Sequence, residues 1–156
     1  MRLTRAAGTR NQETAALIGL ATAERQLDRP GEAAEHASQA MRLARAAGYR
    51  LLEGNAAIAL AEIELTLGQR DHAAERAGQA LAIHRETGHR LGEARTLRLL
   101  GEALLPTKDA DAALPRWRAA LAIFDDAGAS PEAGALRDLL ARRQRRAVAR
   151  GDATRP

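Results

Sequence analysis

A forty-residue period runs through the sequence and limits what the chain can fold into. Glycines recur at this interval, and the first three are each followed by an arginine two residues later and a glutamate five residues later. The recurring glycines are Gly8, Gly48, Gly88 and Gly128. Large and small apolar positions repeat in the same register: Leu60 and Leu100 are each followed by a small residue. Such a period is typical of proteins in which one small unit stacks on the next.

The sequence of each forty-residue unit predicts two helices. In one unit, Leu60, Ile63 and Leu67 follow the spacing of a helix face, and no alternation typical of strands competes with it. We expect Asp71 and Asp111 to cap the second helix of their units, and the recurring glycine to end it in a left-handed conformation. The predicted helices cover 1–7, 11–27, 32–47, 50–67, 72–87, 90–105, 112–127 and 131–149.

These helices predict a single all-α domain over 1–149. It divides into a half repeat (1–8), three full repeats (9–48, 49–88 and 89–128) and a C-terminal capping helix (129–149). We expect 150–156 to be a flexible tail. Pro106 is expected to end the first helix of the third repeat, because proline cannot continue a helix.

The repeated unit resembles the tetratricopeptide repeat (TPR), over nearly the whole chain. In that family a leucine followed by glycine or alanine marks the first helix, and two alanines seven residues apart mark the second. The matching residues are Leu60-Ala61 with Ala73 and Ala80, and Leu100-Gly101 with Ala113 and Ala120. The resemblance implies an α-solenoid, a right-handed superhelix of stacked antiparallel hairpins. The period is forty residues where the family usually has about 34, and alanine or leucine fills most of the family's aromatic positions, Trp117 excepted.

The forty-residue form is similar to TPR sensor regions of actinobacterial transcriptional regulators and signalling ATPases. The most similar phrase covers residues 82–94. This resemblance implies a bacterial regulatory or signalling protein in the cytoplasm. Residues 1–8 repeat residues 41–48 with one change, so the sequence starts with the end of a second-type helix. We therefore expect the chain to be a segment of a larger regulator.

The resemblance also implies where a partner binds. TPR proteins hold extended peptides or helices in a concave groove lined by their first helices. By register, the partner-binding residues are Arg25, Asn55, Ile58, Glu62, Arg95, Arg98 and Glu102. Their mixture of charged and apolar types suits a protein segment with acidic and apolar anchors, and Arg95 with Arg98 is the best pair for a carboxylate.

The net positive charge of the chain comes from its C-terminal end. From Pro131 onward seven arginines accompany three acidic residues, and this excess of four equals the net charge of the whole chain. An alternative function is therefore nucleic-acid binding through Arg142, Arg143, Arg145 and Arg146. The same helix carries an apolar stripe and lacks aromatic residues for base stacking, so a capping helix is the preferred interpretation and nucleic acid is an unlikely partner.

Two further patterns have structural interpretations. Glutamates in the ladder Arg10/Glu13, Arg50/Glu53 and Arg90/Glu93 suit the first turn of a helix, and the arginines can pair with an adjacent repeat. The open first hairpin, around Leu3, Leu17 and Leu20, offers a third function, self-association.

Catalysis and metal binding find no support. The chain has no cysteine, and its histidines and serines occur in no hydrolase, zinc or phosphate-loop motif. We expect no catalytic residue, metal or cofactor. No apolar run is long enough to span a membrane, and the N-terminal residues lack a signal peptide's apolar stretch, so a cytoplasmic protein without membrane contact is predicted.

Overall fold

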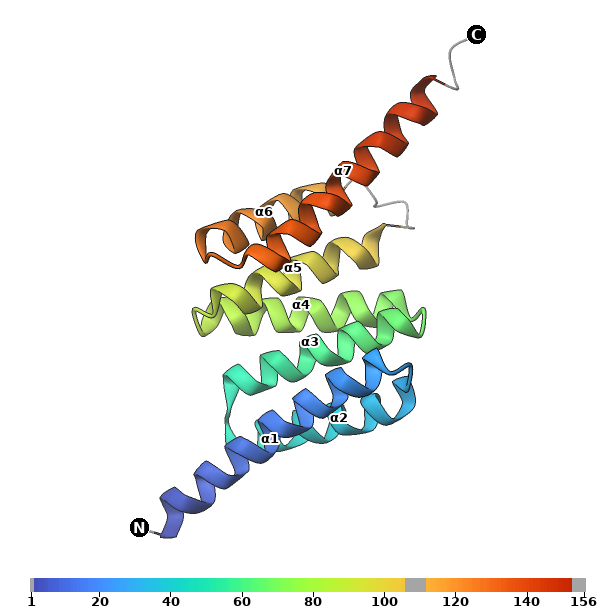
Figure 1. Cartoon of the computed structure of the whole chain (residues 1–156). Helices are drawn as coiled ribbons and strands as arrows, with labels where there is room; N and C mark the ends of the chain where they lie inside the picture. The colour runs from blue at the N-terminus through green and yellow to red at the C-terminus, as the bar shows by residue number, and fades with distance from the viewer. Residues whose placement is uncertain (1, 106–111, 153–156) are drawn as a thin grey trace.

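The computed structural model describes residues 2–105 and 112–152, with side chains for 8–105 and 112–146. The described residues form seven helices and no strand (Figure 1). The helices are α1 (Arg2–Gln26), α2 (Pro30–Ala47), α3 (Arg50–Thr66), α4 (Arg70–Glu86), α5 (Arg90–Leu104), α6 (Ala113–Asp126) and α7 (Ser130–Asp152).

The helices stack in chain order. Each packs against the next, and the first helices of successive hairpins also meet, α1 against α3 and α3 against α5. The start of α1 and the end of α7 extend beyond the stack at opposite ends (Figure 1). The all-α solenoid is thus confirmed, while its right-handed sense stays a prediction.

Glycines end the helices at the turns where the repeat requires it. Gly48, Gly88 and Gly128 have φ values of 69°, 67° and 67°, the left-handed region that costs glycine little. The capping prediction for Asp71 is wrong: α4 begins at Arg70 and is preceded by Gln69, so Asp71 lies in the first turn, where its charge favours the helix dipole. Asp111 lies outside the described residues.

Both end helices are longer than predicted. The expected break between 1–7 and 11–27 is wrong, because α1 is continuous from Arg2 to Gln26 and Gly8 lies inside it. At the other end α7 continues to Asp152, into the segment predicted as a tail; residues 153–156 lie outside the described chain. α5 ends at Leu104, close to the end predicted from Pro106, which itself is not described.

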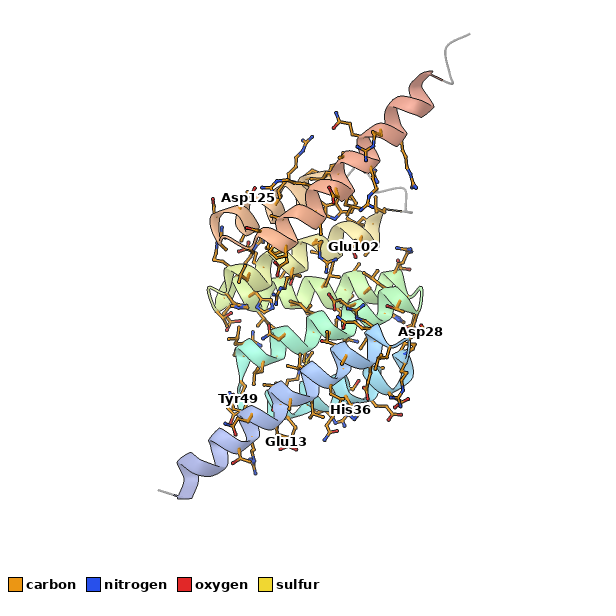
Figure 2. The ribbon with its side chains drawn as sticks, in the orientation of Figure 1. Glu13, Asp28, His36, Tyr49, Glu102 and Asp125 are labelled. Carbon is orange, nitrogen blue, oxygen red and sulfur yellow. The ribbon has the colours of Figure 1, made fainter. Side chains whose placement is uncertain are left out.

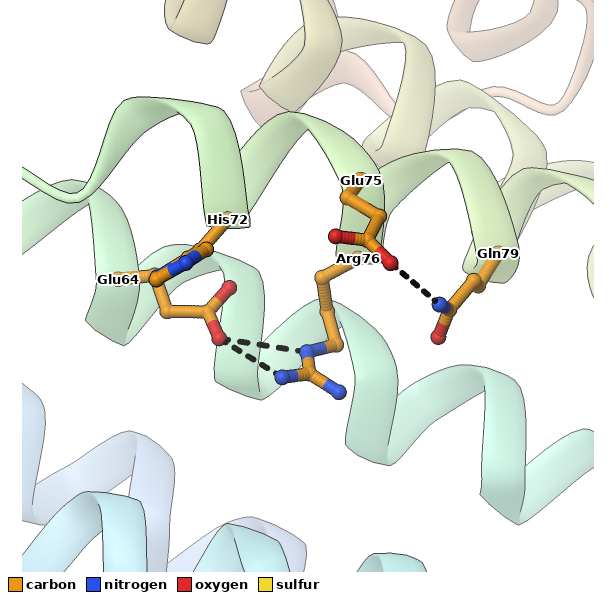
Figure 3. Close-up of a pocket in the computed structure, with 5 residues that line it drawn as sticks. All are labelled: Glu64, His72, Glu75, Arg76 and Gln79. Atoms are coloured by element: carbon orange, nitrogen blue, oxygen red, sulfur yellow. Dashed lines mark hydrogen bonds and ion pairs between the residues drawn. The ribbon is translucent and has the colours of Figure 1, made fainter.

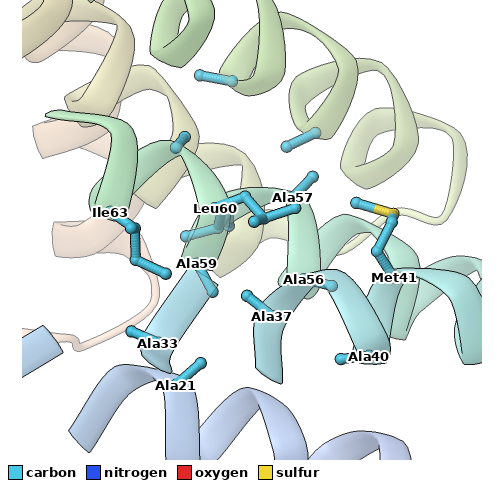
Figure 4. Close-up of a cluster of buried hydrophobic side chains, with 14 of the residues drawn as sticks. Ala21, Ala33, Ala37, Ala40, Met41, Ala56, Ala57, Ala59, Leu60 and Ile63 are labelled. Carbon is cyan, nitrogen blue, oxygen red and sulfur yellow. The ribbon is translucent and has the colours of Figure 1, made fainter. Parts of the chain in front are cut away.

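Small residues line the contact surfaces between neighbouring helices, which we call seams. The core around α2 and α3 consists mostly of alanines with Met41, Ile58, Leu60 and Ile63 among them (Figure 4). Many of these alanines are completely buried, which lets helix axes approach closely. Further along, the only tryptophan of the chain, Trp117 of α6, is buried against Gly101 of α5 and donates its Nε1–H to the Arg98 carbonyl at 3.0 Å.

The Arg/Glu ladder joins consecutive hairpins. Glu53 accepts hydrogen bonds from Arg45 of the preceding helix at 2.9 Å and from Arg50 at 2.7 Å, and Arg50 also pairs with Glu86 in the adjacent repeat. Burial raises the pKa of Glu53, but the two guanidinium groups outweigh it and hold the pKa below its ordinary value. Arg85 and Arg90 bind Glu93 in the same way. The ladder is therefore part of the scaffold in these two units.

Substitution of Gly101 tests the packing of the small-residue seam. A Cβ atom at Gly101 would overlap the Trp117 ring, so Gly101→Ala should lower the free energy of unfolding by about 2 kcal/mol. Gly78 is also helical but has open space around it, and Gly78→Ala should instead stabilise by up to about 1 kcal/mol through helix propensity. Urea unfolding followed by circular dichroism measures both. Equal stability of Gly101→Ala and the parent protein would contradict the packing.

Candidate functional site

A hollow lies across the first helices of three successive hairpins. It has a volume of about 290 Å³. Its lining residues are Arg25 of α1, Glu62, Leu65 and Thr66 of α3, and Leu99, Arg98 and Glu102 of α5. Figure 2 shows Glu102 on the side of the stack where these first helices face the viewer. The volume of the hollow is close to the lower limit of about 300 Å³ for pockets that hold drug-sized ligands.

Four charged side chains connect the three helices across this hollow. Glu62 lies at the centre: its Oε2 atom is 3.2 Å from Nη2 of Arg25, and its Oε1 atom is 3.2 Å from Nη2 of Arg98. Arg98 also binds Glu102, one turn further along α5. All four side chains are partly exposed, between 19% and 31%. Two positive and two negative charges leave the hollow locally neutral.

One hydrogen-bond donor of this network, the Nε–H group of Arg25, has no acceptor among the described residues. Its Nε atom is shielded from solvent. Burying an N–H group without an acceptor costs free energy, about 1–3 kcal/mol. This donor lies below the accessible surface of the hollow, so a ligand meets Arg25 through the exposed part of its guanidinium group.

Four of the seven predicted partner-binding residues meet here, and three do not. Ile58 is only 9% exposed and belongs to the core, so it is not available to a ligand. Asn55 is half-buried and does not line the hollow. Arg95 binds Glu132 of α7 at 3.3 Å, while Arg98 turns to α3. The two arginines expected to act as a pair thus have carboxylate partners on different helices.

The hollow also includes three residues that are not among the seven predicted ones, Leu65, Thr66 and Leu99. Thr66 lies one helical turn after Glu62, and this spacing could have indicated it. Leu99 is 1% exposed and repeats an alanine of the preceding unit, so its register indicates a core residue. It forms the floor of the hollow, an accessory role that no sequence pattern distinguishes.

A second hollow, of about 160 Å³, lies between the two helices of one hairpin (Figure 3). Its central contact is Arg76 of α4 with Glu64 of α3, at 3.0 Å. Forty residues earlier His36 makes the equivalent contact with Glu24 at 2.7 Å. Because the contact recurs within hairpins, it belongs to the repeat rather than to a particular ligand. The sequence analysis did not predict it.

The arginines of the alternative function lie along α7. Arg142, Arg145 and Arg146 are exposed, and Arg143 is half-buried with its guanidinium 5.9 Å from the centre of the Trp117 ring. A cation above an indole face at this distance stabilises the contact. Arg143 therefore helps to hold α7 against α6, as expected of a capping helix.

His84 is a completely buried titratable group within the stack. It lies between Gly54 of α3 and Gly92 of α5, and its Nδ1 atom is 3.3 Å from Nδ1 of His89. Burial, together with nearby His89 and Arg95, lowers the pKa of His84 from 6.5 to about 4. His84 is therefore neutral at pH 7 and takes the packing position that Phe124 has in the next repeat.

Comparison with protein-family models gives no match, and comparison with curated proteins gives no similar sequence. Among the described residues no group of three or more histidine, aspartate and glutamate side chains is arranged to hold a metal ion. None of the described helices combines the length and apolarity of a membrane span. The arrangement of the hollow across α1, α3 and α5 is therefore the observation on which a function must be based.

The neutral His84 makes the stability of the fold dependent on pH. Its pKa is lower in the folded state, so between about pH 6.5 and 4 the unfolded chain takes up a proton that the folded chain does not. The contribution of neutral His84 to the free energy of unfolding is fully present above about pH 6.5. It decreases by about 3 kcal/mol as the pH falls to 4. Urea unfolding at both pH values should show this loss in the parent protein and a smaller loss in His84→Phe. Exposed His72 is the control, and His72→Gln should retain the full loss; an identical pH dependence in all three proteins would contradict the assignment.

Proposed function

We propose that the chain is a non-enzymatic docking module of the TPR type, which binds a segment of a partner protein along α1, α3 and α5. The observation that carries the proposal is the hollow that spans these three helices, with Arg25 and Arg98 beside Leu65. Cationic and apolar side chains in one hollow favour a segment that has an acidic group next to an apolar one.

Arg25 is the main contact in this proposal. Among the described residues Arg98 is already paired with two glutamates, whereas Arg25 is paired with one, and its side chain is 26% exposed. A carboxylate of the partner binds the exposed part of the Arg25 guanidinium group, and the ligand's apolar side chain packs on Leu65. Glu62 and Glu102 hold the guanidinium groups in position before the partner arrives, which reduces the entropy cost of binding.

The wider role follows from the repeat. The similarity of the forty-residue units to sensor regions of actinobacterial regulators supports a place in a bacterial regulatory or signalling protein. In that role the module performs no chemistry; occupancy of the hollow is the signal.

Selection from a random peptide library tests the docking proposal. Peptides selected on the parent protein should be enriched in an acidic residue close to an apolar one. Arg25→Ala should weaken their binding at least about tenfold, measured by fluorescence anisotropy, because it removes a charged contact from a partly desolvated site. Arg98→Ala should weaken it as well.

The matched control is Arg145→Ala, which removes the same charge from an exposed position of α7. It should leave peptide binding unchanged, and thermal unfolding of each variant checks the fold. The proposal fails if Arg25→Ala and Arg145→Ala bind the selected peptides as strongly as the parent protein does. Equal weakening by both variants would also contradict it, since general charge attraction would then explain the binding.

A further inference from the structure

The first hairpin presents less apolar surface for self-association than the sequence predicts. Leu17 packs against the core, Leu20 is 44% exposed, and the Leu3 side chain lies outside those described. The structure does not show what covers the exposed part of Leu20, and self-association stays a prediction.

Arg70 connects the start of α4 with the end of α5, beside the docking hollow. Its Nη1 atom donates a hydrogen bond to the carbonyl oxygen of Glu102 at 3.2 Å. Glu102 lines the hollow, as does Thr66, which precedes Arg70 by four residues. Arg70 is exposed and is not itself a lining residue. Its guanidinium group therefore lies at the edge of the hollow, on the α5 side.

The end of α5 explains why Arg70 points there. This helix ends at Leu104, two residues before Pro106. The carbonyl groups of its last turn lack their regular helical donors, and the negative end of the helix dipole attracts a cation. At the position of Arg70 the other two repeats have Pro30 and Ala110, whose side chains carry no donor. The contact is thus particular to this repeat.

Arg70 adds a positive charge beside a neutral network. The cations Arg25 and Arg98 are each held by glutamate, so the hollow by itself has no net charge to attract a carboxylate. The described partner of Arg70 is a backbone carbonyl, which leaves its charge uncompensated within the described residues. A guanidinium group has five N–H donors, and the bond to Glu102 uses one of them. Arg70 can therefore bind an anion while it still holds the end of α5.

We propose that Arg70 is a second anchor for the docking segment and binds a carboxylate on the α5 side of the hollow, while Arg25 binds one on the α1 side. This inference rests on the proposed function and specifies the partner further. Leu65 belongs to α3, the helix between α1 and α5. The recognised segment therefore has one acidic residue on each side of an apolar residue.

The width of the three helices sets the spacing of the two acidic residues. Packed helix axes lie about 8–10 Å apart, so two steps from α1 to α5 span roughly 16–20 Å. An extended segment advances about 3.3 Å per residue and covers this width in about five residues. A single acidic residue cannot reach both arginines, which is why two are required.

Binding of selected peptides to Arg70 variants tests the second anchor. Peptides selected on the parent protein should carry two acidic residues about five positions apart, with an apolar residue between them. Arg70→Ala should weaken their binding at least about fivefold, measured by fluorescence anisotropy, because a charged hydrogen bond at a partly exposed site is lost. Arg70→Gln should weaken it to a similar extent, because glutamine retains a donor for the Glu102 carbonyl but not the charge.

A double-mutant cycle identifies the acidic residue that meets Arg70. Alanine at one acidic position of the peptide should remove the difference between Arg70→Ala and the parent protein, and alanine at the other position should remove the difference made by Arg25→Ala. If neither peptide substitution changes the effect of Arg70→Ala, the direct contact is wrong.

Arg118→Ala is the matched control, because Arg118 is an exposed arginine of α6 that does not line the hollow. It should leave peptide binding unchanged, and thermal unfolding checks the fold of every variant. If Arg70→Ala binds as strongly as the parent protein while Arg25→Ala is weakened, the second anchor is wrong and the docking proposal stands. Parent-like binding by Arg70→Gln alone would assign Arg70 a purely structural role at the end of α5 and would also overturn the anchor. Parent-like binding by Arg25→Ala would overturn the docking proposal itself.

Discussion

Close contact between small residues is the constraint on which this structure depends. A hairpin of two helices cannot bury its own apolar stripe, and stacking buries it only when the facing residues let the helix axes approach. The fully buried alanines of α2, α3 and α4 provide that approach. Where a large side chain enters a seam, glycine compensates for it: Gly101 faces Trp117, and Gly54 with Gly92 encloses His84.

The surface proposed for docking uses positions that the packing between helices does not require. Along the line where α1, α3 and α5 succeed one another, side chains are free to vary, and they carry the network of Arg25, Glu62, Arg98 and Glu102. Because each helix is fixed by its own hairpin, the charged groups are held in place across three repeats. In the proposed function, this repeated scaffold presents the charged network to a partner.

The sequence predicts what depends on local and repeated interactions, and misses what depends on neighbours. Hairpins and glycine turns are predicted well because helix periodicity and left-handed φ are local properties. Gly8 matches the turn glycines in sequence, yet α1 continues through it. No described helix packs back at that point to stabilise a turn. Extending the existing helix is therefore more favourable than ending it. The site shows the same limit. Register identifies Arg25, Glu62, Arg98 and Glu102 as residues of the groove. It does not reveal that Arg95 points to Glu132 of α7, or that Ile58 is buried in the core.

Pulsed electron-spin distance measurements test the stacked architecture most directly. Gln39, Gln79 and Ala119 occupy one repeat position on the exposed sides of α2, α4 and α6, and the absence of cysteine permits pairwise labelling. With labelled protein diluted into unlabelled protein, the 39–119 distance should be about twice the 39–79 distance, because each repeat adds one step along the stack. Similar distances for all three pairs would indicate a closed helical bundle and would contradict both the solenoid and its hollow.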